Sequence, residues 1–367
     1  MNMRNITEVC SVKMGQSPDS KTYNHSRQGI PFYQGNADFG EIHPRTRIWC
    51  TAPVKIANKG DILLSVRAPI GAMNISTEKC CIGRGLAAIT PNKEKCDGKF
   101  LYYAILSKIP LLVSQGTGST FKAIGRKVLE KIMIPNCTIE RQSQIAKLMS
   151  LLEQLINVRN KQLINLEKLA KSRFIEMFNT EKNEDKLISL CKFIDYRGKT
   201  PEKTDSGLPF ITAKNVKMHY MSFDTQEYIS KENYDKAMTR GFPQIGDVVF
   251  TTEAPLGNVC RIPHIDTEFY IGQRIITMQT EILEPIYLEY ALSSDEFRKK
   301  LVEKSSGSTV TGIRSKLLEQ LTIPVPEKSK QNQFAIFVKQ TDKSKFDGIK
   351  IINLCEILKI KSWRRES

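Results

Sequence analysis

The longest regular pattern of apolar and polar positions begins at Ile145. From Ile145 to Met177, apolar residues recur mostly at alternating intervals of four and three, with no proline or glycine between them, and Arg159 and Arg173 fill the two gaps. This spacing is typical of the seam of a coiled coil, the stripe along which one helix packs on another. We therefore predict a long helix over residues 142–178.

A second long helix is predicted over residues 328–367. Its apolar stripe is broader, and Gly348 weakens the helix by ~1 kcal/mol relative to alanine. A single exposed helix leaves its apolar stripe in water, so we expect the two helices to pair with each other. The alternative is that they bind only foreign partners. The stripe expected on the second helix comprises Phe334, Val338, Phe346, Ile349, Ile357 and Ile360, widened by Ile351, Leu354 and Leu358.

Shorter apolar runs precede each long helix and predict strands. Ile62–Val66 and Val248–Thr252 are apolar, rich in β-branched residues and bounded by glycine and proline, as buried strands are. Amphipathic helices are expected over residues 100–114 and 286–303, each followed by a Gly/Ser/Thr loop, a short helix and an Ile-Pro segment. This order predicts an α+β unit with a mixed sheet. Further strands are expected at Ile30–Tyr33, Leu86–Thr90, Leu208–Ile211 and Ile275–Met278.

The elements occur twice because the chain is an internal duplication. The segment Gly60–Gly71 returns as Gly246–Gly257, and Gly118–Thr120 returns as Gly307–Thr309. A period of roughly 185–190 residues indicates a duplicated domain, since solenoid repeats are about 20–50 residues long. Two similar domains suggest one kind of task performed in two places. We predict globular domains at residues 1–141 and 187–327, each followed by its long helix, at 142–178 and 328–367.

The net charge of the chain indicates a class of binding partner. The formal net charge is +16, which favours association with a polyanion such as a nucleic acid, although many basic proteins bind none. Residues 1–178 hold 26 Lys and Arg against 13 Asp and Glu, whereas residues 179–367 hold 29 against 26. The copies therefore kept a common framework and diverged in charge, as expected if each contacts a different surface.

Cysteine and histidine usage argues against metal and disulfide chemistry. The nine cysteines are an odd number without a Cys-x-x-Cys pair, and the four histidines have no metal-ligand spacing to cysteine pairs. Reduced thiols are the simplest account. No secretory leader opens the sequence and no apolar run approaches 18 residues, so we expect a cytoplasmic protein that does not span a membrane.

The sequence carries no recognisable catalytic motif. It has no Pro-Pro dipeptide, so it lacks the Asn/Asp-Pro-Pro-aromatic site of amino-methyltransferases, and it has neither a Walker loop nor Gly-x-Gly-x-x-Gly. Asp97-Gly98-Lys99 resembles the end of a nuclease motif without its preceding acidic partner. No histidine recurs at equivalent positions of the two copies. We therefore expect a binding protein without catalytic residues, metal or cofactor.

Five motifs recur in one order in both copies. Gly-Gln-Ser-Pro or Gly-Lys-Thr-Pro comes first, followed by Ile/Leu-Pro-Phe and by Gly-Asp with its apolar run and Pro-x-Gly. Gly-Ser-Thr with Ile-Pro, and then Gln-x-Gln before a long helix, complete the set. Any one motif is weak evidence. Together, over nearly the whole chain and in both copies, they resemble the specificity subunit of type I restriction–modification systems.

The resemblance implies a function and a set of partners. It implies two target recognition domains, each reading one part of a split duplex DNA target, separated by an antiparallel pair of coiled-coil helices. It implies two modification (adenine methyltransferase) subunits and two restriction–translocase subunits as partners. The partner flips and methylates the base, in keeping with the missing catalytic motifs. The alternatives are a stand-alone duplex DNA-binding regulator and a scaffold or RNA-binding protein.

Base-reading residues are expected where the copies differ and offer suitable donors. Arginine pairs with guanine, and asparagine or glutamine pairs with adenine, through two hydrogen bonds in the major groove. Any one candidate can instead be a solvated surface charge. The candidates in the first copy are Lys21, Tyr23, Arg27, Gln34, Asn36, Arg45, Arg47, Arg67 and Arg84. Those in the second are Arg197, Lys199, Lys214, Asn215, Lys217, Glu253, Arg261, Gln273 and Arg274.

The two Gly-Ser-Thr loops are candidates of a different kind. They precede short basic helices, and small hydroxyl residues with free backbone N–H groups suit a phosphate, although helix capping alone also explains them. The loop residues are Ser119 and Thr120 in the first copy and Ser308 and Thr309 in the second; the cations that follow them are Lys122, Arg126 and Lys127, and Arg314 and Lys316.

Overall fold

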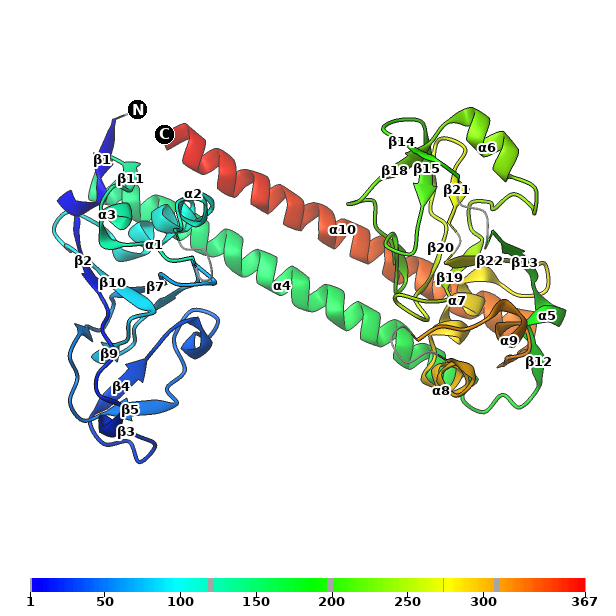
Figure 1. Ribbon diagram of the computed structural model, residues 1–367, viewed down its shortest axis with the longest axis horizontal. Coiled ribbons are helices and arrows are strands. Elements are labelled where there is room, and N and C mark those ends of the chain that lie inside the picture. The colour runs from blue at the N-terminus through cyan, green and yellow to red at the C-terminus, as the bar shows by residue number, and fades with distance from the viewer. Residues whose placement is uncertain (1, 118–121, 197–200, 273, 307–310, 367) are drawn as a thin grey trace. The chain divides into compact units, whose positions relative to one another are not determined.

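The computed structural model describes residues 2–117, 122–196, 201–272, 274–306 and 311–366, with side chains of the last helix described to residue 360. The chain forms two compact units (Figure 1). One comprises Met1–Asn160 and Ile349–Ser367, and the other comprises Lys161–Gly348. Each unit therefore contains one globular domain and a segment of both long helices.

The first domain is built on two sheets. A four-stranded antiparallel sheet has the order β2-β10-β7-β8, and a five-stranded sheet has the order β3-β5-β4-β9-β6, in which β4 and β9 are parallel. The four-stranded sheet packs on helix α1 (Gly98–Leu106) and on the start of the long helix α4 (Ile139–Phe178). The strands are β1 (Met3–Asn5), β2 (Cys10–Met14), β3 (Tyr23–Asn24), β4 (Ile30–Tyr33), β5 (Ile48–Cys50), β6 (Ile56–Ala57), β7 (Ile62–Ser65), β8 (Met73–Ile75), β9 (Cys80–Ile82), β10 (Leu86–Pro91) and β11 (Met133–Pro135), which pairs with β1.

The second domain repeats this design. Its four-stranded antiparallel sheet has the order β13-β22-β19-β20, and a second sheet, β14-β18-β15-β21, contains the parallel pair β15 and β21. Its strands are β12 (Glu184–Lys186), β13 (Lys192–Asp195), β14 (Lys203–Thr204), β15 (Leu208–Ile211), β16 (Val216–Lys217), β17 (Tyr220–Met221), β18 (Glu227–Ile229), β19 (Val248–Thr251), β20 (Val259–Arg261), β21 (Tyr270–Ile271), β22 (Ile275–Gln279) and β23 (Thr322–Pro324). The prediction of a duplicated α+β domain is confirmed.

The prediction of one amphipathic helix in each domain is wrong in one respect. Each domain has two shorter helices over this range. In the first domain α1 ends at Leu106 and α2 (Ile109–Ser114) starts anew, because Pro110 fits only a first helical turn. In the second, α7 (Pro285–Ser293) is followed by α8 (Asp295–Lys304), where the Ser294 hydroxyl caps the new helix by accepting from the Phe297 N–H. The remaining short helices are α3 (Arg126–Leu129), α5 (Leu187–Leu190), α6 (Lys231–Ala237) and α9 (Ser315–Leu318).

A buried glutamine fastens each long helix to its domain. The long helices are α4 (Ile139–Phe178) and α10 (Lys328–Glu366). In the first domain the Gln142 side chain accepts from the Asp97 N–H at 2.9 Å, and in the second Gln331 accepts from the Glu284 N–H at 2.8 Å. Both glutamines are almost fully buried, so the repeated Gln-x-Gln motif has a structural role.

Helices α4 and α10 pack on each other with opposite directions. Leu152 and Ile156 of α4 form a small core with Cys355 of α10. In the other unit Leu163 of α4 faces Gly348, and the Phe174 ring lies 5.4 Å from the Phe334 ring. Numbers rise along α4 while they fall along α10, so the helices are antiparallel. The predicted pairing is confirmed.

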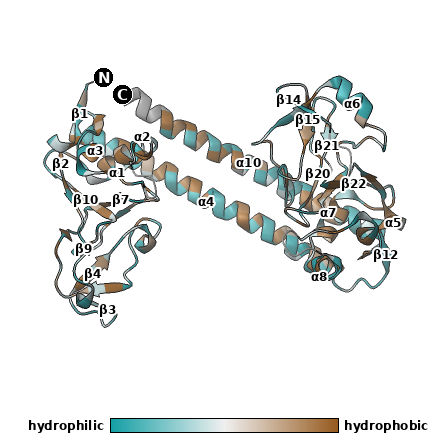
Figure 2. Cartoon of the chain, in the orientation of Figure 1, coloured by the Kyte–Doolittle hydropathy of each residue, from teal (hydrophilic) through white to brown (hydrophobic). Residues whose placement is uncertain are grey.

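The stripe predicted on α10 is wrong in its central and C-terminal parts. Phe346, Ile349, Ile357 and Ile360 are 56, 46, 47 and 54 % exposed. The buried positions beyond Val338 are instead Thr341, Gly348 and Cys355. A Cβ added at Gly348 lies 3.3 Å from Leu163, so small residues on this face let the two helices approach closely. Ile351 of the predicted stripe does pack against the core of Leu152, Ile156 and Cys355, whereas the four bulky residues named above are exposed. Figure 2 shows hydrophobic positions recurring along both helices.

Candidate nucleic-acid interface

Three backbone segments of the first domain meet at the end of strand β7. The Val66 N–H donates to the Gly85 carbonyl at 2.9 Å, and the Val66 carbonyl accepts from the Ile124 N–H at 2.9 Å. These bonds bring together three of the predicted cations, Arg67, Arg84 and Lys122, all of them exposed. Within the ranges that the structure describes, no acidic side chain forms an ion pair with them. We call Arg67, Arg84 and Lys122 the strand-end cluster.

The Gly-Gln-Ser-Pro motif builds one wall of this cluster. The Gly15 N–H donates to the Leu86 carbonyl at 2.8 Å, and the Ser17 hydroxyl accepts from the Arg84 N–H at 3.3 Å. A Cβ at Gly15 would lie only 2.1 Å from the Gly83 carbonyl oxygen, so no other residue permits this approach. Ser17 was not among the predicted site residues, although its position in a repeated motif is the signal that could have found it.

The second domain has the same backbone junction with different charges. The Thr252 N–H donates to the Arg274 carbonyl at 3.0 Å, and the Thr252 carbonyl accepts from the Ile313 N–H at 3.0 Å. Glu253 occupies the place of Arg67, and its carboxylate pairs with the Arg274 guanidinium at 2.9 Å. The same backbone junction therefore carries three exposed cations in the first copy and a neutralised Glu253–Arg274 ion pair in the second.

A rigid turn presents Arg27 elsewhere in the first domain. Arg27 adopts φ +61°, and its guanidinium carbon lies 5.8 Å from the centre of the Trp49 ring. The Asn24 side chain closes the turn, accepting from the Gln28 N–H at 3.0 Å and donating to the Gln28 carbonyl at 2.9 Å. Stacking on an aromatic face holds a guanidinium in a defined orientation. Trp49 was not predicted, because it lies in β5 and its partner Arg27 lies in a loop 22 residues earlier.

Several predicted residues of the first domain have partners inside the fold. The Tyr23 hydroxyl donates to the Pro18 carbonyl at 2.9 Å, and burial raises the pKa of this phenol. Arg47 donates from Nη2 at 2.6 Å to the buried carboxylate of Asp38. Arg126 pairs with Glu130 at 2.6 Å. The remaining predicted side chains, at Lys21, Gln34 and Arg45, are exposed, and Asn36 is half-buried.

Asn215 and Arg261 of the second domain are engaged by the fold. Asn215 is 3 % exposed; its amide oxygen accepts from Thr212 and its amide nitrogen donates to the Ser222 and Thr225 carbonyls. Arg261 donates to Glu289 at 2.5 Å and to Asp342 at 3.1 Å. The side-chain polar groups of Asn215 and Arg261 already have hydrogen-bond partners within the fold. We therefore do not propose these two residues as DNA contacts.

The other predictions for the second domain divide into two groups. Lys214 is exposed and lies 3.6 Å from Glu227, Lys217 is half-buried in β16, and Arg314 and Lys316 are exposed at α9. The rest lie outside the described residues: Arg197, Lys199, Gln273, Ser308 and Thr309, together with Ser119 and Thr120 of the first domain.

Three further features of the described ranges bear on function. No group of three or more His, Cys, Asp or Glu side chains there is placed to hold a metal ion. All nine cysteines are free thiols. None of the helices that the structure describes is long and apolar enough to cross a membrane.

Two copies of one α+β domain on paired antiparallel helices, with charges that differ on a shared scaffold, define a duplicated binding protein. The chain belongs to the family of the type I restriction modification DNA specificity domain, whose family model matches residues 1–168 and 172–354. The predicted family is confirmed, and each half of the chain carries one such domain.

Relatives with the same description support this assignment, and one solved structure shares the fold. A chain described as the specificity subunit of the type I restriction enzyme MjaX, from Methanocaldococcus jannaschii, is 44% identical over 169 residues, 46% of this chain and 40% of that one. The MjaVIII specificity subunit of the same organism is 25% identical over 316 residues, 78% of this chain and 73% of that one. The crystal structure of an S subunit from M. genitalium covers 100% of this chain and 95% of that one with a TM-score of 0.61; at 14% identity it shows a shared fold. The MjaX match thus spans less than half of that relative.

Proposed function

We propose that this protein is the DNA-specificity subunit of a type I restriction–modification complex. Its two target recognition domains each bind one half of a split, asymmetric duplex target. It has no catalysis of its own and positions two adenine methyltransferase subunits and, in the complete assembly, two restriction–translocase subunits in the cytoplasm. The observation that carries the proposal is the match of the DNA specificity domain to both halves of the chain.

The strand-end cluster supports contact with DNA. Arg67, Arg84 and Lys122 are exposed cations at a backbone junction where Gly15 approaches the Gly83 carbonyl closely. Phosphate contacts position a protein on the duplex, and arginine also reads guanine edges. The corresponding place in the second domain carries the Glu253–Arg274 pair, so the domains offer different donors from one scaffold, as different half-sites require. Arg27, held over Trp49, is the second candidate reader.

The long helices support binding of protein partners. Leu148, Leu151, Leu155 and Val158 of α4 follow one another at spacings of three and four and are 45, 62, 38 and 51 % exposed. On α10, Ile349, Ile357 and Ile360 are similarly exposed. Contiguous exposed apolar stripes on helices mark protein-binding surfaces. We assign these stripes to the methyltransferase subunits.

Co-expression with the cognate methyltransferase subunit tests the proposal. The expected result is a stable complex that methylates adenines at a two-part sequence, while neither protein alone does so. The stand-alone regulator predicts instead that the chain binds a specific duplex by itself and forms no complex. Binding to RNA in preference to the duplex contradicts both.

A further inference from the structure

A chain of charges joins the second domain to helix α10. The Glu289 carboxylate in α7 is 1 % exposed; it accepts from His219 at 2.8 Å and from Arg261 of β20 at 2.5 Å. Nη2 of the same Arg261 guanidinium donates to Asp342 of α10 at 3.1 Å, and Lys345 pairs with Asp342 at 3.3 Å. Burial alone raises the pKa of the Glu289 carboxyl, but His219 and Arg261 outweigh it and hold that pKa below its usual range. The interaction between Glu289 and Arg261 is therefore an ion pair.

The first domain is attached differently at the equivalent place. Glu153 and Asp342 are equivalent, because each is the eleventh residue after its buried glutamine (142 to 153, 331 to 342). Glu153 accepts one hydrogen bond, at 2.8 Å, from the Tyr103 hydroxyl. Counted from Asp97 and Glu284, whose N–H groups bond to the two buried glutamines, Tyr102 and Glu289 are each the fifth residue (97 to 102, 284 to 289), so the first copy has no carboxylate there. Among the described residues, this chain of charges is found in the second domain and not at the equivalent place of the first.

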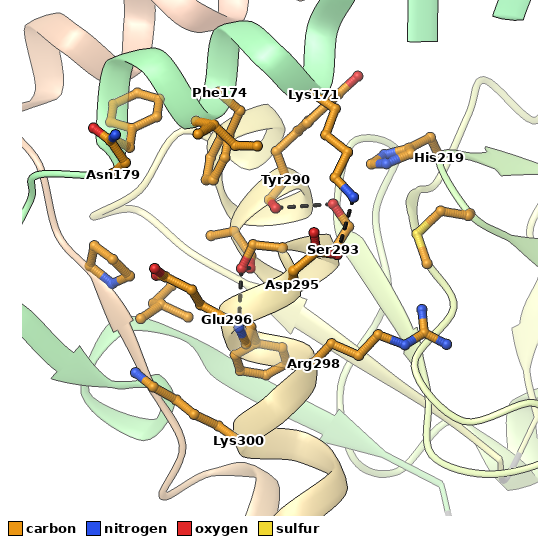
Figure 3. Close-up of a pocket in the computed structure, with 18 of the residues that line it drawn as sticks. Lys171, Phe174, Asn179, His219, Tyr290, Ser293, Asp295, Glu296, Arg298 and Lys300 are labelled. Atoms are coloured by element: carbon orange, nitrogen blue, oxygen red, sulfur yellow. Dashed lines mark hydrogen bonds and ion pairs between the residues drawn. The ribbon is translucent and has the colours of Figure 1, made fainter. Parts of the chain in front are cut away.

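A cluster of aromatic rings and a pocket lie next to each other where the second domain meets the long helices. The rings of Phe174, Tyr290 and Phe334 contact one another, and the His219 ring stacks on Tyr290 at 4.5 Å. Beside these rings, on the α4 side, lies a pocket of about 560 Å³, which Figure 3 shows between Lys171, Phe174 and Asp295. On the α4 side the Lys171–Asp295 ion pair, at 3.1 Å, joins two exposed side chains, whereas the Arg261–Asp342 bond joins the domain to α10 through a chain that ends at the buried Glu289.

We propose that Asp342, acting through Arg261 and Glu289, is a positioning residue that fixes the orientation of the second domain on α10 and so limits the spacer accepted between half-sites. This rests on the proposed function. One base pair is about 3.4 Å along the duplex. At ~20 Å from the junction, roughly the reach of such a domain, a tilt of about 10° moves the reading surface by one base pair. A small loss of rigidity therefore appears as tolerance of neighbouring spacers.

The test is the variant Asp342→Asn, studied in the complete methyltransferase complex. This change removes the negative charge of residue 342 on α10 and leaves the Arg261–Glu289 pair intact. Methylation is measured on duplexes whose spacer is one base pair shorter than, equal to or one longer than the preferred length. The expected result is an increase of about fivefold in the relative rate on the two altered spacers, on the order of 1 kcal/mol at ~1.4 kcal/mol per tenfold. The rate on the preferred spacer and the melting temperature stay close to wild type.

Three further variants make the result specific. Asp347→Asn, the same change at an exposed position of α10, leaves the spacer preference unchanged. Asp342→Glu retains the carboxylate and restores the wild-type preference. Arg261→Met with Glu289→Leu replaces the buried ions by apolar side chains, keeps the domain folded and broadens the preference.

The outcomes separate this inference from the proposed function. An unchanged spacer preference in Asp342→Asn, with wild-type split-site methylation, overturns the positioning role alone. Equal broadening in Asp347→Asn also overturns it, because the effect is then one of charge on α10. Absence of split-site methylation by the wild-type complex overturns the proposed function, and the positioning role with it.

Discussion

Replacing the strand-end cluster with glutamines gives a quantitative test of the DNA interface. The variant Arg67→Gln, Arg84→Gln, Lys122→Gln removes three exposed positive charges from one backbone junction and keeps side chains that can hydrogen-bond. Because within the described ranges these side chains form no ion pairs, the change should cost the fold little. We expect it to weaken DNA binding mainly through lost phosphate contacts.

The size of the effect follows from counterion release. Each phosphate contact contributes about −0.9 to the slope of log affinity against log salt concentration, so three contacts contribute about −2.7. Between 200 and 50 mM salt, a fourfold change, the wild-type complex then gains about 40-fold more affinity than the variant. The difference in affinity between the wild type and the variant is smallest at high salt.

Fluorescence anisotropy of a labelled duplex target with the methyltransferase complex measures both slopes. A matched control is Lys93→Gln, Lys95→Gln, Lys99→Gln, which removes three exposed cations just beyond the other end of strand β10. Strand β10 is six residues long, so the two sets lie about 20 Å apart along the strand direction. The control should keep the wild-type slope. Equal slopes for the cluster variant and the wild type would refute the assignment of the cluster to DNA.

Three further predictions follow from the helices and the core. Gly348→Ala should stabilise the protein by ~0.5–1 kcal/mol in urea unfolding, because helix propensity improves and the flexible end of Leu163, 3.3 Å from the new Cβ, can shift; a loss of stability would contradict it. Inserting four residues after Leu163 adds about 6 Å of helix and should lengthen the preferred spacer by one or two base pairs, whereas an unchanged spacer shows that the helices are not its ruler. Iodoacetamide at pH 8 should label chiefly Cys137, because the other eight thiols are buried. Burial also raises the pKa of Cys191 and Cys260 to about 12, so rapid labelling of either thiol in the native protein would contradict the packing.

The fold could be predicted where a local pattern has one interpretation. The repeated Gly-Asp turn before an apolar run identified β7 and β19, and the four-and-three spacing identified α4. The pattern on α10 has two apolar stripes, and the bulkier one, through Phe346 and Ile357, is exposed. Which stripe faces α4 depends on how closely the helices approach at Gly348, and this is a tertiary contact that hydrophobicity does not encode.

The candidate site could be predicted only by residue type. The difference between Arg67 and Glu253 in aligned motifs is visible in the sequence, and the structure adds that Arg84 and Lys122 join Arg67 through backbone bonds. Asn215 and Arg261 have the same chemistry as base-reading residues. Arg261 is engaged by Glu289 and Asp342, 28 and 81 residues away, so no local signal separates it from an exposed donor. Asn215 is engaged by Thr212 and Ser222, three and seven residues away, in a local turn that residue type alone does not reveal.

Mapping of N6-methyladenine in DNA from cells that express the complex tests the central claim most directly. The account predicts methylation at a two-part sequence with a fixed gap. It also predicts that exchanging residues 187–327 for those of a relative changes one part only and leaves the gap unchanged. Methylation at an uninterrupted sequence, or a change of both parts on exchange, would contradict two domains that each read one half-site.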